Sequence, residues 1–145
     1  MIIETKMKEK LLEEANQAKK MAYVPYSNFP VGAALLTREG KIYTGCNIEN
    51  ATYGATNCAE RTAFFKGVSE GERAFIALAI VSDHPGFTFP CGICRQVIYE
   101  FAKDIQIIFQ NAEGEILTLY TKDLLPYPFS EDDLAKTKEA KTNEC

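Results

Sequence analysis

The chain is poor in several features that mark particular protein classes. Its 145 residues include no tryptophan and a single histidine, His84. No stretch approaches the ~20 consecutive apolar residues that span a bilayer, so we expect no membrane segment. Acidic side chains outnumber basic ones by 20 to 16, whereas nucleic-acid-binding domains usually carry a clustered excess of Lys and Arg. We therefore expect neither a membrane nor a nucleic acid as a partner.

Signals of export and of several domains are also missing. Charged residues follow directly after Met1-Ile2-Ile3, without the long apolar region of a signal peptide, so we expect a cytoplasmic protein. No internal repeat, Pro-rich linker or low-complexity tract divides the chain, and its length lies in the single-domain range. We predict one domain over residues 1–145. Its polar tail, about 131–145, either forms a last helix capped near Ser130 or frays.

Cysteine is the informative residue type in this composition. The chain has five cysteines, which are Cys46, Cys58, Cys91, Cys94 and Cys145. An odd number of cysteines in a chain without an export signal favours metal ligands or catalytic thiols over a disulfide framework. Because there is one histidine, any proton shuttle is either His84 or a residue of another type.

The hydrophobic pattern predicts helices that alternate with buried strands. Apolar residues at three- and four-residue intervals indicate helices, and short apolar runs bounded by turn residues indicate strands. The predicted helices are 5–23, 58–66 and 91–103, and the predicted strands are 31–37, 42–47, 75–82, 105–110 and 116–120. This order indicates an α/β fold in which a mixed sheet carries helices on both faces.

Three of the cysteines fall at the starts of two predicted helices. Cys58 opens one helix, and Cys91 and Cys94 open the other. The unpaired N–H groups and the dipole of a helix N-terminus stabilise an ionised thiol. Thiolates suit zinc, and three protein ligands with one open position are typical of a catalytic zinc site. The spacing therefore predicts a zinc ion held by three cysteines.

Glu60 lies two residues after Cys58, where a carboxylate can carry protons for a water on the metal. Together, Cys58-x-Glu60 and Pro90-Cys91-x-x-Cys94 match the three-cysteine form of the zinc deaminase signature. In that signature the glutamate is the general acid and base and not a ligand.

Other interpretations of the same residues stay open. Cys91-x-x-Cys94 alone is compatible with a redox pair, and Cys46 could be a fourth thiolate that closes a structural site. Asn57 and Glu60 fit a helix capping box, in which Glu60 bonds back to the Asn57 backbone. The joint occurrence of the two cysteine motifs, each at the start of a predicted helix, favours the catalytic interpretation.

Over nearly its whole length the chain resembles the short, homotetrameric type of cytidine deaminase. The stretches that carry this resemblance are Tyr26-Ser27-Asn28-Phe29-Pro30-Val31-Gly32-Ala33, Gly45-Cys46-Asn47-Ile48-Glu49-Asn50-Ala51, Cys58-Ala59-Glu60-Arg61-Thr62-Ala63, Pro90-Cys91-Gly92-Ile93-Cys94-Arg95-Gln96 and Leu124-Leu125-Pro126. The resemblance implies a three-layer α-β-α fold with a five-stranded mixed sheet. It also implies one zinc ion per subunit and a homotetramer.

The resemblance further implies a role for each matching residue. Glu60 would be the proton shuttle, and Cys58, Cys91 and Cys94 would hold the zinc. The substrate contacts it implies are Asn47 and Glu49 on the ribose, Phe29 and the Ala59 backbone on the base, and Tyr53 and Phe129 in the pockets of neighbouring subunits. Zn²⁺ with three thiolates carries a formal charge of about −1. Arg61 would offset this charge by donating to a ligand sulfur, and Arg95 is a second candidate.

The implied reaction is hydrolytic deamination of cytidine and 2′-deoxycytidine to uridine and 2′-deoxyuridine, a step of pyrimidine salvage. A deaminase for a nucleoside analogue such as blasticidin S is the alternative with the same fold, and the segment 47–50 argues for the nucleoside. A polynucleotide-editing deaminase fits the acidic composition less well. A non-catalytic zinc module with four cysteines is the alternative from another class.

Overall fold

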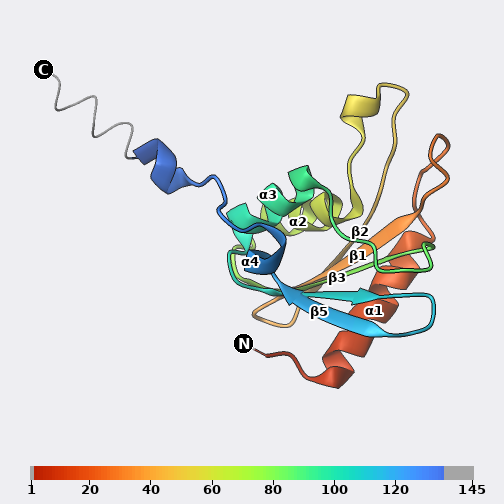
Figure 1. The fold of residues 1–145 in the computed structure, drawn as a ribbon, viewed down its shortest axis with the longest axis horizontal. Helices are drawn as coiled ribbons and strands as arrows, with labels where there is room; N and C mark the ends of the chain where they lie inside the picture. Colours follow the sequence, from red (N-terminus) through yellow and green to blue (C-terminus); the bar gives the residue numbers. More distant parts are fainter. Residues whose placement is uncertain (1, 136–145) are drawn as a thin grey trace, which may run out of the picture.

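The computed structural model describes residues 2–135, in which one sheet lies between two layers of helices (Figure 1). The elements in chain order are α1 (Thr5–Lys19), β1 (Val31–Thr37), β2 (Ile42–Cys46), η1 (Tyr53–Ala55), α2 (Ala59–Ser69), β3 (Phe75–Ser82), α3 (Gly92–Phe101), β4 (Gln106–Gln110), β5 (Ile116–Tyr120) and α4 (Thr121–Leu124). No helix within residues 2–135 is long and apolar enough to cross a bilayer.

The five strands form one mixed sheet in the order β2-β1-β3-β4-β5. β3 and β4 run parallel, and the other three neighbouring pairs are antiparallel. The central strand β1 is buried along its whole length, and β3 is buried at six of its eight positions. Near-continuous apolar runs of this kind are expected where helices cover both faces of a sheet. The predicted mixed sheet is confirmed.

Each face of the sheet has its own apolar core. On one face Leu11 and Ala15 of α1 pack in a cluster with Ala34 of β1. On the other face Phe64 of α2 packs in a cluster with Leu78 of β3, and α3 contributes to the same cluster. Figure 1 shows α1 on one side of the strands and α2 and α3 on the other. The three-layer α-β-α arrangement is therefore present.

Two glycines let the helices approach the β1–β2 hairpin closely. A Cβ atom on Gly32 would lie 1.9 Å from the carbonyl oxygen of Ala15 in α1. A Cβ atom on Gly45 would lie 2.3 Å from the carbonyl oxygen of Ala59, in the first turn of α2. Neither contact is possible for a residue with a side chain, so Gly45 fixes how closely the start of α2 sits on the sheet.

Several helix boundaries differ from those the sequence predicts. α1 ends at Lys19 and not at Tyr23, because Tyr23 exchanges backbone hydrogen bonds with Asn47 (3.0 Å) and Glu49 (2.8 Å). α2 continues past Gly67 to Ser69, because Gly67 packs inside the fold and does not end the helix. α3 ends two residues before the predicted Lys103. The short elements η1 and α4 were not predicted.

The start of the acidic tail agrees with the expected cap. The backbone N–H of Ser130 donates to the Asp133 carboxylate at 2.9 Å, and residues 131–135 are helical. Asp133 thus caps the beginning of this turn. The rest of the predicted tail, together with Cys145, lies outside the described residues.

The close contact at Gly45 leads to a prediction about stability. In Gly45→Ala the new methyl group would meet the Ala59 carbonyl, a backbone atom that cannot turn aside. We expect the free energy of unfolding to fall by at least ~1–3 kcal/mol, as for other overpacked sites. Urea denaturation measures the loss. Gly54→Ala is the control, because no atom lies within 4 Å of a Cβ at Gly54; equal stability of both variants would contradict the prediction.

Candidate metal centre and active site

Three cysteine sulfurs meet where α2 and α3 begin. Cys58 is the N-cap residue of α2, Cys91 is the N-cap residue of α3, and Cys94 lies in the first turn of α3. Their three Sγ atoms all lie within 4.8 Å of one another, and those of Cys58 and Cys91 are 3.8 Å apart. The backbone N–H of Cys94 donates to the Cys91 sulfur at 3.5 Å. The predicted three-cysteine cluster is confirmed.

This donor set fits a zinc ion. Three thiol ligands within a few ångströms match the soft ligands and the tetrahedral geometry that zinc prefers, with one position left for a small molecule. The two helix N-termini add partial positive charge that favours ionised sulfurs. Among residues 2–135 the metal-ligating group contains Cys58, Cys91 and Cys94 and no fourth side chain. Three cysteine ligands therefore leave the fourth coordination position of a tetrahedral zinc ion open.

Cys46 lies away from this cluster, so the four-thiolate hypothesis is wrong for the described residues. Cys46 pairs with Gly32 in the β1–β2 register, and paired residues point their side chains to the same face of the sheet. A side chain at Gly32 would point into α1, so Cys46 also faces the α1 side. The zinc ligands, by contrast, lie at the ends of helices on the opposite face.

Arg61 lies beside the sulfur cluster, as the sequence predicts. Its Nη2 atom donates to the Cys58 Sγ atom at 3.4 Å. A hydrogen bond from the Cys94 thiol and another from Arg61 lower the pKa of Cys58 to about 5, against the opposing effect of burial. The same hydrogen bond to Cys58, together with partial burial, raises the pKa of the Cys94 thiol. Cys58 is thus an ionised ligand near neutral pH.

Arg95, the second candidate, has other partners. Its Nε atom donates to the Pro90 carbonyl and its Nη1 atom donates to the Leu124 carbonyl, each at 2.9 Å. Arg95 therefore joins the start of α3 to the end of α4. Its guanidinium thus hydrogen-bonds to two backbone carbonyls and not to a cysteine sulfur of the cluster.

Glu60 is a buried carboxylate next to the cluster. It lies in the first turn of α2, is 4% exposed, and its Oε2 atom is 3.7 Å from the Cys94 sulfur. Burial is the main cause that raises the pKa of Glu60 to about 7. The capping-box interpretation is wrong, because the Asn57 N–H donates to the Ile48 carbonyl and Cys58 is the N-cap. A carboxyl group with this pKa can both take and give a proton near neutrality.

A cavity of about 200 Å³ opens beside Glu60 and the sulfurs. Its lining residues are Phe29, Val31, Asn47, Cys58, Ala59, Glu60, Thr88, Phe89 and Cys91. Three residues that the sequence assigns to substrate binding, Phe29, Asn47 and Ala59, therefore share one cavity with the predicted proton carrier. The structure brings them together from β1, β2 and α2 and the loops that flank these elements.

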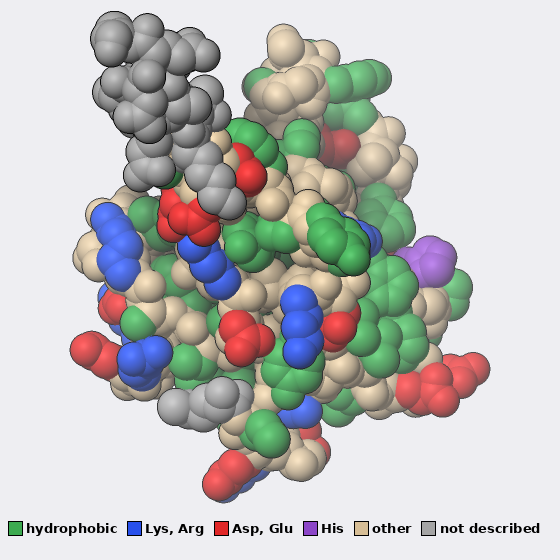
Figure 2. Space-filling model, turned by 60° about the vertical axis from the view of Figure 1, so that its left-hand side comes forward, with side chains coloured by type: hydrophobic (Ala, Val, Ile, Leu, Met, Phe, Trp, Pro, Cys, Tyr) green, Lys and Arg blue, Asp and Glu red, His purple; other side chains and the backbone are tan. Residues whose placement is uncertain are grey.

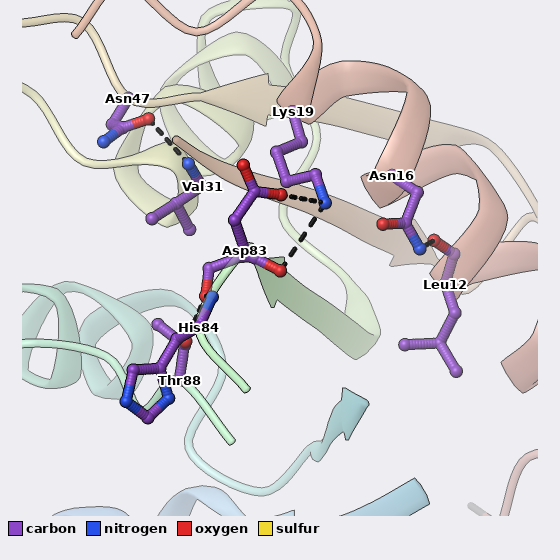
Figure 3. Close-up of polar contacts among 9 residues, drawn as sticks. Leu12, Asn16, Lys19, Val31, Asn47, Asp83, His84 and Thr88 are labelled. Carbon is purple, nitrogen blue, oxygen red and sulfur yellow. Dashed lines mark hydrogen bonds and ion pairs between the residues drawn. The ribbon is translucent and has the colours of Figure 1, made fainter. Parts of the chain in front are cut away.

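Asn47 also organises the wall of this cavity. Its Oδ1 atom accepts a hydrogen bond from the Val31 N–H at 2.9 Å, and its Nδ2 atom donates to the Phe29 carbonyl at 2.8 Å. Figure 3 shows the Asn47 carboxamide directed at Val31. A carboxamide can make about four hydrogen bonds, so one donor and one acceptor position stay available for a ligand.

Glu49 and Tyr53 lie in a neighbouring depression. This depression, about 350 Å³ in volume, is lined by them with Tyr26, Ser27 and Thr56. The Glu49 carboxylate accepts from the backbone N–H groups of Tyr26 and Ser27 at 3.2–3.3 Å. Tyr53 is 73% exposed. Within one chain these two residues are not lining residues of the cavity at Glu60.

Phe129 also lies apart from the cavity of its own chain. It is 61% exposed, and its backbone carbonyl accepts a hydrogen bond from the Gln96 side chain of α3 at 2.9 Å. Thr88 and Phe89, in contrast, line the cavity without having been predicted to do so. Their position directly before Pro90-Cys91 was the available signal in the sequence.

The separate locations of Cys46 and Cys94 lead to a prediction about zinc content. Cys94→Ala removes one of three sulfurs, and we expect the purified protein to lose its zinc. Cys46→Ala is the matched control, because its side chain lies on the other face of the sheet; we expect about one zinc ion per chain to remain. Metal analysis of dialysed protein measures both. Loss of zinc from Cys46→Ala would restore the four-thiolate hypothesis.

Comparisons with known proteins agree with this arrangement. The model of the cytidine and deoxycytidylate deaminase zinc-binding region matches residues 5–110. The cytidine deaminase of Sporosarcina psychrophila is 54% identical over 132 residues, covering 90% of this chain and 97% of that protein. The cytidine deaminase of Halalkalibacterium halodurans is 48% identical over 128 residues, covering 88% and 97%.

A solved structure and a more distant relative complete the comparison. The crystal structure of cytidine deaminase from Burkholderia pseudomallei has a TM-score of 0.81 at 47% identity, covering 83% of this chain and 98% of that chain. The blasticidin-S deaminase of Bacillus cereus is 29% identical over 129 residues. The identity and coverage of the cytidine deaminases show that the chain belongs to the cytidine deaminase family.

Proposed function

We propose that this protein catalyses the zinc-dependent hydrolytic deamination of cytidine, and also of 2′-deoxycytidine, with release of ammonia. The observation that carries the proposal is the buried Glu60, which lies beside the cysteine sulfurs and lines a cavity together with Phe29 and Asn47. The sequence relation to cytidine deaminases over nearly the whole chain supports cytidine as substrate. A single domain over residues 1–145 and a cytoplasmic role in pyrimidine salvage complete the proposal.

Cys58, Cys91 and Cys94 would hold the zinc ion. When bound, zinc supplies Lewis acidity that lowers the pKa of a coordinated water. Arg61, through its bond to the Cys58 sulfur, offsets part of the negative charge of three thiolates. This matters because a more negative ligand set would weaken the effect of the metal on the water.

Glu60 would carry the protons of the reaction. It would take one proton from the attacking water and pass it to N3 of the base. It would then take the second proton of that water from the hydroxyl group on C4 and deliver it to the amine, which leaves as ammonia. The balance is one water and one cytidine consumed, and one uridine and one ammonia formed. A carboxyl group whose pKa burial raises to about 7 is suited to both directions of transfer.

The remaining lining residues would bind and orient the nucleoside. Phe29 offers an aromatic ring to the pyrimidine, and the Ala59 backbone lies beside Glu60 for a contact with the base. The free donor and acceptor of Asn47, and the solvent-facing part of the Glu49 carboxylate, are suited to the two ribose hydroxyls. Ribose contacts of this kind support a nucleoside rather than a polynucleotide. On the face shown in Figure 2, acidic and basic side chains are mixed, without a continuous basic track.

We also propose that the active protein is a homotetramer. Tyr53 and Phe129 are large, apolar and strongly exposed in a single chain. Sites for small ligands bury most of the ligand surface and often lie at interfaces, whereas the cavity at Glu60 is small and open to solvent. Contributions of Tyr53 and Phe129 from neighbouring copies would complete it.

The role of Glu60 leads to a test of the proposed reaction. Glu60→Gln keeps the size of the side chain but cannot carry the proton, so we expect zinc content and folding to be retained. Turnover of cytidine should fall by at least ~10²–10⁴-fold. The loss of ultraviolet absorbance that accompanies conversion to uridine measures the rate, and a zinc chelator should abolish it in the wild type. Near-normal turnover of the variant would remove Glu60 from the mechanism.

The tetramer leads to a test of shared sites. Phe129→Ala should raise the KM for cytidine more than it lowers the free energy of unfolding, because the exposed ring makes few contacts within its own chain. Dilution that dissociates the assembly should reduce specific activity while zinc stays bound. Light scattering measures the size of the assembly at each concentration. A fully active monomer would contradict the shared site and leave the zinc chemistry unaffected.

A further inference from the structure

Phe89 is an aromatic residue of the cavity wall that no step of the proposed mechanism uses. It is 47% exposed, and its ring packs edge-to-face on that of Phe109, with centroids 5.1 Å apart and planes at 65°. Phe109 belongs to the core under α2 and α3 and is fully buried. Pro90 follows and restricts the backbone of Phe89 to extended conformations. The phenyl ring of Phe89 is therefore held in place by the buried ring of Phe109.

The loop that carries Phe89 is held at several points. The hydroxyl groups of Ser82 and Thr88 hydrogen-bond across its two ends. Lys19 of α1 forms an ion pair with Asp83 at 2.8 Å, which Figure 3 shows. The carbonyl of Pro85 accepts from the Ala112 N–H at 3.0 Å. Because these contacts tie the loop to α1 and to the segment after β4, the wall cannot easily withdraw from a larger ligand.

The chemistry of the proposed reaction, on which this inference rests, fixes which edge of the pyrimidine meets this wall. C4 must face the sulfur cluster, and N3 must face Glu60 at the start of α2. The ring neighbours of C4 are N3 and C5, so C5 lies on the side away from Glu60. Phe89 lines the cavity from the segment that leads into α3, directly before Pro90 and Cys91, whereas Glu60 lines it from the first turn of α2. The C5 edge of the base therefore faces the side that Phe89 closes.

We propose that Phe89 is a specificity-determining residue that closes the cavity at C5 and rejects pyrimidine nucleosides with a substituent there. Phe89 is one of the residues that line the cavity of about 200 Å³ beside Glu60 and the sulfurs. Since the ring rests on Phe109 and its loop is held, a methyl group at C5 meets a surface that does not yield. One methyl group in a tightly fitted pocket changes kcat/KM by ~10–200-fold.

The test compares cytidine with 5-methylcytidine in the zinc-loaded enzyme. The wild type should prefer cytidine, and Phe89→Ala should raise the kcat/KM ratio of 5-methylcytidine to cytidine by ~10-fold or more. Phe89→Leu should give a smaller rise in the same direction. Both substrates are measured on one preparation, so differences in folded or zinc-loaded fraction cancel in the ratio. Ile116→Ala, which truncates a 41% exposed residue of β5, is the control and should leave the ratio unchanged.

The outcomes separate this inference from the proposed function. A wild type that accepts both nucleosides equally, or a ratio within twofold of the wild type in the folded Phe89 variants, would overturn the role of Phe89. If Phe89→Ala does not fold, Phe89→Leu decides the question. A wild type that holds zinc and converts no cytidine would instead overturn the proposed function.

Discussion

The meeting of two helix N-termini at one end of the sheet is the constraint on which the rest of the site depends. α2 can begin there because Gly45 lets the Ala59 carbonyl approach β2, and α3 begins there because it connects the parallel strands β3 and β4. Cys58 lies at the start of α2, and Cys91 and Cys94 lie at the start of α3, so the positive ends of both helix dipoles act on the same sulfur cluster. A shift of either helix would separate the sulfurs, which is why packing far from the metal bears on the chemistry.

Burial gives Glu60 its chemical character, and the same burial carries a cost. An ionised carboxylate in an apolar setting is destabilised, so burial raises the pKa of Glu60 to about 7. The carboxyl group of an exposed glutamate would be almost fully ionised at neutral pH and would be a poorer acid. Arg61 works in the opposite direction on its side of the cluster, because its guanidinium stabilises the ionised Cys58. Burial thus favours the neutral form of Glu60, whereas the neighbouring Arg61 favours the ionised form of Cys58.

Much of this architecture could be predicted from local sequence patterns. The strands β1, β3 and β5 have the predicted bounds, because continuous apolar runs between turn residues leave little ambiguity. The cysteines could be placed together because each opens a helix. The end of α1 could not be predicted, since it depends on backbone bonds between Tyr23 and a loop more than twenty residues away. The side of the sheet on which Cys46 lies likewise depends on the pairing of β1 with β2, which cannot be predicted from the spacing of the cysteines.

The residues proposed to perform the chemistry and those that shape the cavity differ in how the chain specifies them. Glu60 and the three cysteines are set by short motifs at helix starts, where one turn of backbone fixes several side chains at once. The wall formed by Phe89 depends instead on the hydroxyl pair Ser82–Thr88 and on a core ring, Phe109, from another strand. Changes in this loop can therefore alter which ligands fit without moving the sulfurs or the carboxylate. The proposed catalytic residues are therefore specified by two short motifs, whereas the proposed closure at Phe89 depends on contacts between segments that are distant in the chain.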